Sequence, residues 1–141
     1  MIQRIQSIWL LLASFAGFAS IKWPFYSGNK ITDAATQTKT FVHLNAAQNI
    51  WMLIATVAVA VAAFVAIFLY KDRKRQLMIV TALCFASAVN ILTYFLKAQT
   101  FLEGNLALTA VFVLIIPVLL LLALRGIWKD EQLVRSTNRL R

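Results

Sequence analysis

The sequence predicts an all-α membrane protein, a four-transmembrane-helix bundle with one long loop and a short amphipathic tail. Of its 141 residues, 61% are hydrophobic and only 13% are charged, which is more apolar surface than a soluble domain of this size could bury. The apolar residues fall into uncharged runs, each near the length of about 20 residues that a helix needs to cross a hydrocarbon core of about 30 Å. These runs are Ile5–Ile21, Ile50–Tyr70, Leu77–Leu96 and Leu106–Leu124. No soluble domain fits between them, so we expect a single transmembrane domain over residues 1–141.

The first span is expected at residues 5–26, although the same residues could form a cleavable signal peptide. Arg4 precedes the apolar run, and the small residues Gly17 and Ala19 near its end would suit a cleavage site. Against this, the apolar character continues through the aromatic cluster at Trp23–Tyr26, which is typical of a membrane interface. We therefore expect a retained span.

The connections between spans differ in length. The long connection, between the first and second spans, covers residues 27–48 and is polar and Thr-rich. Only Lys39–Val42 has strand-like composition, so either a small hairpin or a plain loop is expected. The turns at Lys71–Arg75 and Ala98–Asn105 are short and predict antiparallel helical hairpins. The remaining spans are expected at 49–70, 76–97 and 106–127, followed by a tail at 128–141.

Orientation follows from the basic residues, because cytoplasmic loops of membrane proteins carry an excess of Lys and Arg. If the amino terminus is cytoplasmic, ten of the fourteen basic residues lie on the cytoplasmic side. These ten are Arg4, Lys71, Arg73, Lys74, Arg75, Arg125, Lys129, Arg135, Arg139 and Arg141. The other four are Lys22, Lys30, Lys39 and Lys97. We predict a multi-pass protein of the bacterial inner membrane with both termini in the cytoplasm.

The net charge of +9 indicates lipid rather than nucleic acid as the partner. The basic residues lie at the ends of apolar runs instead of being spread over a soluble domain. Anionic lipid headgroups at the cytoplasmic face are therefore the expected partners.

Small residues predict how the first two spans pack, because in lipid they let helix backbones approach closely. Ala13 and Gly17 share one face of the first span, and Ala58, Ala62 and Ala66 recur at four-residue spacing on the second. We expect these two rows to pack within the molecule rather than to form a dimer face.

A polar stripe marks the third span. Its members recur at three- and four-residue steps, so they share one helix face. They are Cys84, Ser87, Asn90, Tyr94 and Lys97. The stripe could be a polar groove or a docking face. The favoured interpretation is structural, with Asn90 bonded inside the bundle and Lys97 reaching the interface, because an unpaired amide in hydrocarbon costs several kcal/mol.

Little in the sequence indicates catalysis or coupled transport. The acidic residues Asp33 and Glu103 lie on different loops, and Cys84 is the only cysteine. The single histidine, His43, could form a site with Asp33 after folding, but a lone loop histidine is usually only solvated. We therefore expect no enzyme activity, no cofactor and no metal site. No ionisable residue lies at mid-depth, which disfavours a proton-coupled carrier. Pro117 is expected to kink the fourth span.

The tail has two competing interpretations. Basic residues attract anionic lipid, so lipid anchoring accounts for Arg135, Arg139 and Arg141. Asp130 and Glu131 serve no purpose in such attraction, which favours a docking peptide for a cytoplasmic protein. Because an even number of spans places both ends on one side, we also expect Arg4 to lie close enough to one of these acidic residues for an ion pair.

Both ends of the chain resemble those of a known family. The opening Met1-Ile2-Gln3-Arg4-Ile5-Gln6-Ser7 and the closing segment Lys129–Arg141 are similar to an uncharacterised family of small four-span membrane proteins from Bacteroidetes bacteria, domain of unknown function 4293. The resemblance implies an inner-membrane location and no known activity, cofactor or substrate. It also draws attention to the recognisable positions at the cytoplasmic face. These are Gln3, Arg4, Asp130, Glu131, Arg135, Ser136 and Arg139.

The functional prediction is an accessory or scaffold subunit whose cytoplasmic ends bind a membrane or cytoplasmic protein. The alternative is a small-molecule carrier or lipid-binding membrane protein that uses the polar stripe of Ser87, Asn90 and Tyr94. A continuous polar cavity along that stripe would favour the alternative, whereas a closed core would favour the scaffold.

Overall fold

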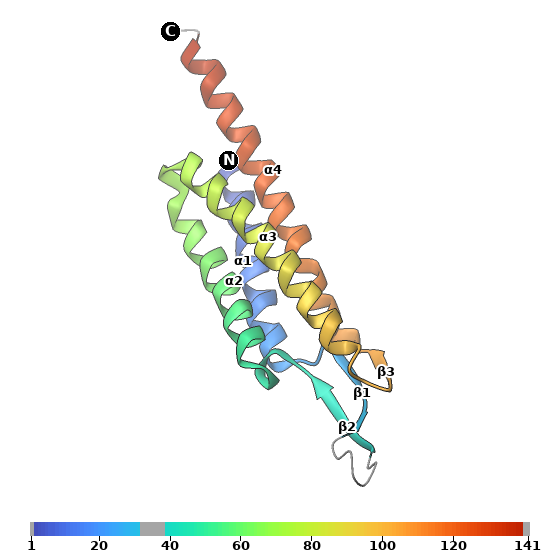
Figure 1. Ribbon diagram of the computed structural model, residues 1–141. Coiled ribbons are helices and arrows are strands. Elements are labelled where there is room, and N and C mark those ends of the chain that lie inside the picture. Colours follow the sequence, from blue (N-terminus) through green and yellow to red (C-terminus); the bar gives the residue numbers. More distant parts are fainter. Residues whose placement is uncertain (1, 32–38, 140–141) are drawn as a thin grey trace.

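The computed structural model describes residues 2–31 and 39–139, which form four long helices and a small sheet (Figure 1). The helices are α1 (Ile2–Lys22), α2 (Ile50–Phe68), α3 (Arg73–Ala98) and α4 (Val111–Arg139). The strands are β1 (Tyr26–Ile31), β2 (Lys39–Leu44) and β3 (Glu103–Leu106). The helices lie side by side along their length, with the strands at one end and both chain ends at the other. We call these the sheet end and the termini end.

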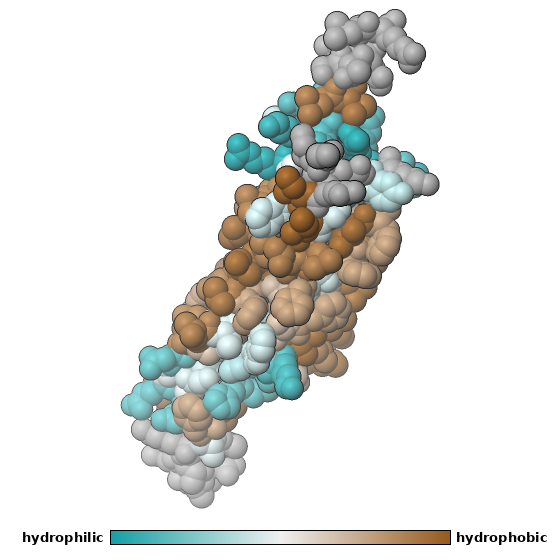
Figure 2. Space-filling view, turned by 180° about the vertical axis from the view of Figure 1, so that it is seen from behind, coloured by the Kyte–Doolittle hydropathy of each residue, from teal (hydrophilic) through white to brown (hydrophobic). Residues whose placement is uncertain are grey.

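The predicted fold class is confirmed. Four helices of the described chain are long and apolar enough to cross a membrane: Ile5–Lys22, Ile50–Phe68, Arg73–Ala98 and Leu108–Val134. Apolar residues cover the middle of the bundle, and hydrophilic residues gather toward its two ends (Figure 2). Large apolar side chains such as Phe85 and Met78 point outward, 72% and 73% exposed. An outer surface of this kind requires lipid around it, so the chain is a membrane protein.

Several helix boundaries differ from the predicted spans. α3 begins at Arg73 rather than at 76, and α4 begins at Val111 rather than at 106. α1 ends at Lys22 rather than at 26, because Pro24 has no backbone N–H to donate and disfavours helical geometry at the residue before it. Tyr26 instead begins β1. At the other extreme, α4 continues without a break to Arg139, well past the expected end at 127. The predicted tail is therefore an extension of α4, and we call residues 131–139 the α4 extension.

Each helix packs against two neighbours, in the order α1, α2, α3, α4 and back to α1. Where α1 meets α2, Gly17 lies so close to Ala60 that an added Cβ would sit 2.8 Å from the Ala60 Cβ. The prediction that α1 and α2 pack through small residues is correct, but only one member of the predicted row on α2 is buried. Ala60, Ala63 and Ala66 are fully buried, whereas Ala58 is exposed and Ala62 is half-buried.

β1 and β2 pair in the antiparallel manner of the hairpin that the sequence left open, and a third strand adds to them. β1 pairs with both neighbours in antiparallel fashion, in the order β2-β1-β3. β3 was expected to be part of a plain turn. Gly28 and Gly104 face each other across β1 and β3, where a Cβ on either would collide with the opposite backbone, so this close pairing requires glycine.

The sheet is attached to the bundle through the residues that follow α1. Phe25 donates its N–H to the Leu44 carbonyl at 2.7 Å and accepts from the Ala107 N–H at 3.0 Å. Its ring packs at a tilt against Tyr94 of α3, with ring centroids 4.8 Å apart. These contacts hold the sheet against the ends of the helices.

Candidate functional site

Four polar residues, three of them buried, make hydrogen bonds between the helices at the termini end. Gln6 of α1 donates a hydrogen bond from Nε2 to Oδ2 of Asp130 on α4 at 2.6 Å. Arg73, the first residue of α3, donates to the backbone carbonyl of Asp130 at 3.1 Å. Gln76 donates to the Ala66 carbonyl in the last turn of α2 at 2.9 Å. We call Gln6, Arg73, Gln76 and Asp130 the polar junction, because together they join all four helices.

The junction is almost closed to solvent, with Gln6 only 5% and Asp130 only 8% exposed. Gly126, one turn before Asp130, makes this closeness possible: a Cβ there would lie 2.8 Å from Cγ of Gln6. A hydrogen bond to a carboxylate is stronger than one between neutral groups, and it weakens little when water is excluded. The junction therefore fixes α1 and α4 relative to each other where α4 leaves the bundle.

Beyond the junction, α4 continues past the ends of the other helices (Figure 1). Its extension exposes apolar side chains, with Leu133 about half exposed and Val134 44% exposed. Basic side chains on the surrounding surface include Lys74, Arg125 and Lys129. The structure thus combines a fixed helix base with an exposed, mixed apolar and basic surface.

The predicted tail residues have different positions. Asp130 is part of the buried junction, so it is not an exposed contact for lipid or for a partner. Glu131, the next residue, is half-buried. The side chains of Arg4, Arg135 and Arg139, and all of Arg141, lie outside the described residues, so the expected ion pair of Arg4 stays a prediction.

The polar stripe of α3 faces the inside of the bundle. Asn90 is 4% exposed and donates from Nδ2 to the Thr56 hydroxyl of α2 at 3.0 Å. Ser87 bonds to the Cys84 carbonyl of its own helix at 2.8 Å. Tyr94 is fully buried, and Lys97 at the sheet end is exposed. The structural interpretation of Asn90 is therefore correct.

Two buried oxygens of the stripe lack a hydrogen bond of standard geometry, Oδ1 of Asn90 and the hydroxyl of Tyr94. The Tyr94 hydroxyl nevertheless lies beside the Thr56 and Ser20 hydroxyls, which makes this region a small polar patch between α1, α2 and α3. Ser87, Asn90 and Tyr94 are each at most 4% exposed, so the stripe lines no open polar path. A closed core of this kind disfavours a carrier.

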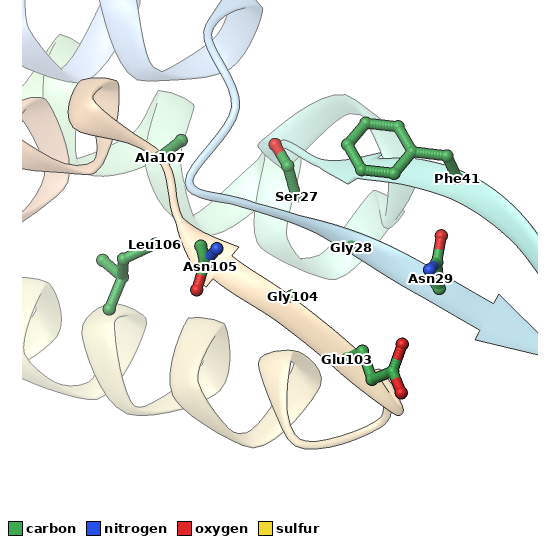
Figure 3. A pocket seen from close by; sticks show the side chains of 9 residues that line it. All are labelled: Ser27, Gly28, Asn29, Phe41, Glu103, Gly104, Asn105, Leu106 and Ala107. Carbon is green, nitrogen blue, oxygen red and sulfur yellow. The ribbon is translucent and has the colours of Figure 1, made fainter.

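A second polar surface lies on the outer face of the sheet and was not predicted. It surrounds a pocket of about 370 Å³ (Figure 3). The strand register places six side chains on this face. They are Ser27, Asn29, Phe41, His43, Glu103 and Asn105. Ser27 Oγ and His43 Nδ1 are 2.9 Å apart, whereas Asp33, the acidic residue considered with His43, is outside the described residues.

Comparison with known proteins assigns the chain to a family. No curated protein and no solved structure matches it. One family model does match, and it covers residues 2–140, which includes all four helices and the sheet. By this match, the chain belongs to the family described as Domain of unknown function (DUF4293).

Proposed function

We propose that this protein is a non-enzymatic accessory or scaffold subunit of the bacterial inner membrane, which presents the α4 extension to a partner protein in the cytoplasm. The polar junction is the observation that carries the proposal. A simple membrane anchor needs no buried carboxylate, because burying one is costly unless it is hydrogen-bonded. Asp130 is placed in such a position and bonded to Gln6, directly before the part of α4 that leaves the bundle.

The geometry of the α4 extension supports docking. A continuous helix whose base is fixed loses little conformational entropy when a partner binds it, whereas a flexible tail loses more. The exposed apolar side chains Leu133 and Val134 sit beside basic ones, a surface that suits a partner with an apolar groove and acidic rim.

The orientation rests on the distribution of basic residues, ten at the termini end and its flanking turn against four at the sheet end. Cysteine labelling with an impermeant reagent tests it in intact spheroplasts, on a Cys84→Ala background. Thr100→Cys, exposed at the sheet end, should be labelled, and Gln132→Cys on the α4 extension should react only after permeabilisation. The reverse pattern would overturn the orientation.

The carrier alternative has less support, because the stripe that it needs is closed by Thr56 and Tyr94.

Docking is tested by photo-crosslinking in living cells. A photoreactive amino acid at Val134, on the α4 extension, should give a discrete protein adduct. The same amino acid at Phe85, which faces lipid, serves as the matched control and should give none. Asp130→Leu removes the carboxylate of the junction without touching Val134, and it should weaken the adduct at equal protein level. Adducts of equal strength in both backgrounds, or adducts with lipid alone at Val134, would refute the proposal.

A further inference from the structure

Five side chains on the outer face of the sheet border one pocket (Figure 3). In the strand register, Phe41 of β2 and Glu103 of β3 both lie opposite Asn29 of β1, so these three form a row across the sheet. A neighbouring row places Asn105 opposite Ser27. Adjacent strands are about 5 Å apart and alternate residues about 7 Å apart, so the side chains span about 10 Å across the strands and about 7 Å along them. The pocket has a volume of about 370 Å³, within the range of about 300–1,000 Å³ usual for small-molecule sites, and we call it the sheet pocket.

The aromatic ring of Phe41 is open to solvent and yet held in place. Phe41 is 64% exposed and belongs to neither buried cluster of the protein. Its ring makes a T-shaped contact with the ring of His43, with centroids 5.1 Å apart, and His43 Nδ1 shares a hydrogen bond of 2.9 Å with Ser27 Oγ. These two links limit the motion of an apolar ring that contributes nothing to the core. A ring fixed in this way loses little conformational entropy when it stacks on the apolar face of a ligand.

The polar side chains of the sheet pocket define what a ligand must offer. The Glu103 carboxylate only accepts hydrogen bonds, whereas the carboxamides of Asn29 and Asn105 both donate and accept. Within residues 2–31 and 39–139, none of the hydrogen bonds between residues uses these three side chains. Glu103 is also the only charged residue among those that line the pocket in this part of the chain. A complementary ligand therefore carries donors for Glu103, donors and acceptors for the amides, an apolar face for Phe41 and no negative charge.

We infer that the sheet pocket binds a neutral pyranose sugar that belongs to a glycan chain. A pyranose ring combines the required groups, because its hydroxyls both donate and accept hydrogen bonds while its C–H groups form an apolar face. The Phe41 ring would stack on that face. Two adjacent hydroxyls would donate to the two oxygens of the Glu103 carboxylate, and the amides of Asn29 and Asn105 would bond to the remaining hydroxyls.

Other ligand classes fit the sheet pocket less well. A sulfated glycan or a phosphorylated headgroup would bring negative charge next to Glu103, and like charges repel. A simple amine has no acceptor for the N–H groups of Asn29 and Asn105. A peptide backbone supplies only one donor per residue, so it lacks the pair of adjacent donors that a carboxylate can accept. The sheet lies at one end of the bundle, beyond the apolar belt, where a water-soluble glycan can reach it (Figures 1 and 2).

Saturation-transfer-difference NMR of the full chain in lipid nanodiscs tests the proposal, with empty nanodiscs as background. Nanodiscs avoid detergents with sugar headgroups, which would compete, and they expose both membrane faces, so the result depends neither on orientation nor on docking of the α4 extension. Cellotetraose and chitotetraose are the neutral probes, and at least one of them should receive saturation at its ring C–H protons. A sulfated heparin tetrasaccharide, tetraalanine and spermidine should receive none. Absence of transfer to both neutral probes, or equal transfer to any of the other three, would overturn the assignment.

Variants locate the binding. Phe41→Leu keeps an apolar side chain on β2 but removes the aromatic face, so it should weaken binding by about fivefold, whereas Phe41→Trp should preserve it. Glu103→Gln should weaken binding by about tenfold, the effect of losing a hydrogen bond to a charged group. Phe68→Leu is the matched control, because Phe68 is 66% exposed but lies at the termini end, and it should change nothing. If Phe41→Leu binds as tightly as the wild type, or if Phe68→Leu weakens binding as much, the sheet pocket is not the site.

Discussion

Replacing Gln6 with leucine should destabilise the protein by about 2 kcal/mol, because a hydrogen bond to a charged group contributes about 1.5–3 kcal/mol. Leucine fills most of the volume of glutamine but cannot donate to Oδ2 of Asp130, which is 8% exposed and so has little access to water as a substitute donor. A change of about 2 kcal/mol corresponds to about a 30-fold shift in the unfolding equilibrium.

A double-mutant cycle separates this bond from general packing. Asp130→Leu alone leaves the Gln6 amide without its acceptor and should cost about 1–3 kcal/mol. The double variant replaces both partners with apolar groups, so its cost should fall short of the sum of the single costs by about 1 kcal/mol or more. Reversible unfolding in mixed micelles with increasing dodecyl sulfate, followed by circular dichroism, measures all three free energies.

The matched control is Gln132→Leu, which makes the same substitution on the exposed face of α4. It should change stability by no more than about 0.5 kcal/mol, as surface substitutions usually do. If Gln6→Leu behaves like Gln132→Leu, or if the single costs simply add, the junction does not hold α1 to α4 and the reasoning fails.

Three further predictions use the same unfolding assay or proteolysis. Gly17→Val should cost about 1–3 kcal/mol, because the added atoms force α1 away from Ala60, while Ala58→Val at an exposed position should cost clearly less. Asn90→Leu should cost under about 1 kcal/mol, because it removes one neutral hydrogen bond and also a buried oxygen that already lacks a partner. A loss above about 2 kcal/mol would mean that Asn90 Oδ1 has a partner of its own. Gly28→Val should detach β3 and make residues 103–106 sensitive to protease while the helices stay protected, and unchanged proteolysis would contradict the close pairing.

The four spans could be predicted because the bilayer imposes one requirement on every span, a long apolar helix whose backbone is internally bonded. The hydrogen-bond partner of Asp130 was harder to predict. Arg4 was expected to pair with one of the acidic residues of the tail, and a hydrogen bond from the neutral Gln6 was not considered. Gln6 lies four and seven residues before the buried Leu10 and Ala13, which places it on the buried face of α1. By the same helical periodicity, Asp130 lies on one face of α4 with the buried Ile127 and Ala123.

The third strand of the sheet could not be predicted from the sequence alone. Glu103–Leu106 contains Gly and Asn, which are depleted in strands, and no alternating apolar pattern. It becomes a strand because β1 offers a free edge about 75 residues earlier in the chain, and pairing satisfies its backbone groups. The polar face around the pocket follows from that register, so it could not be predicted while β3 was taken for a turn.

If the polar junction fixes the α4 extension relative to the bundle, the distance between α4 and its neighbour α3 should be narrowly defined at the termini end. Spin labels on Gln132→Cys and Lys74→Cys, both exposed at the termini end, report the separation of α4 and α3 in lipid nanodiscs, on a Cys84→Ala background. A single narrow distance distribution is expected, and it should broaden when Gln6→Leu is added. A broad distribution before that substitution, or one whose width Gln6→Leu leaves unchanged, would contradict it.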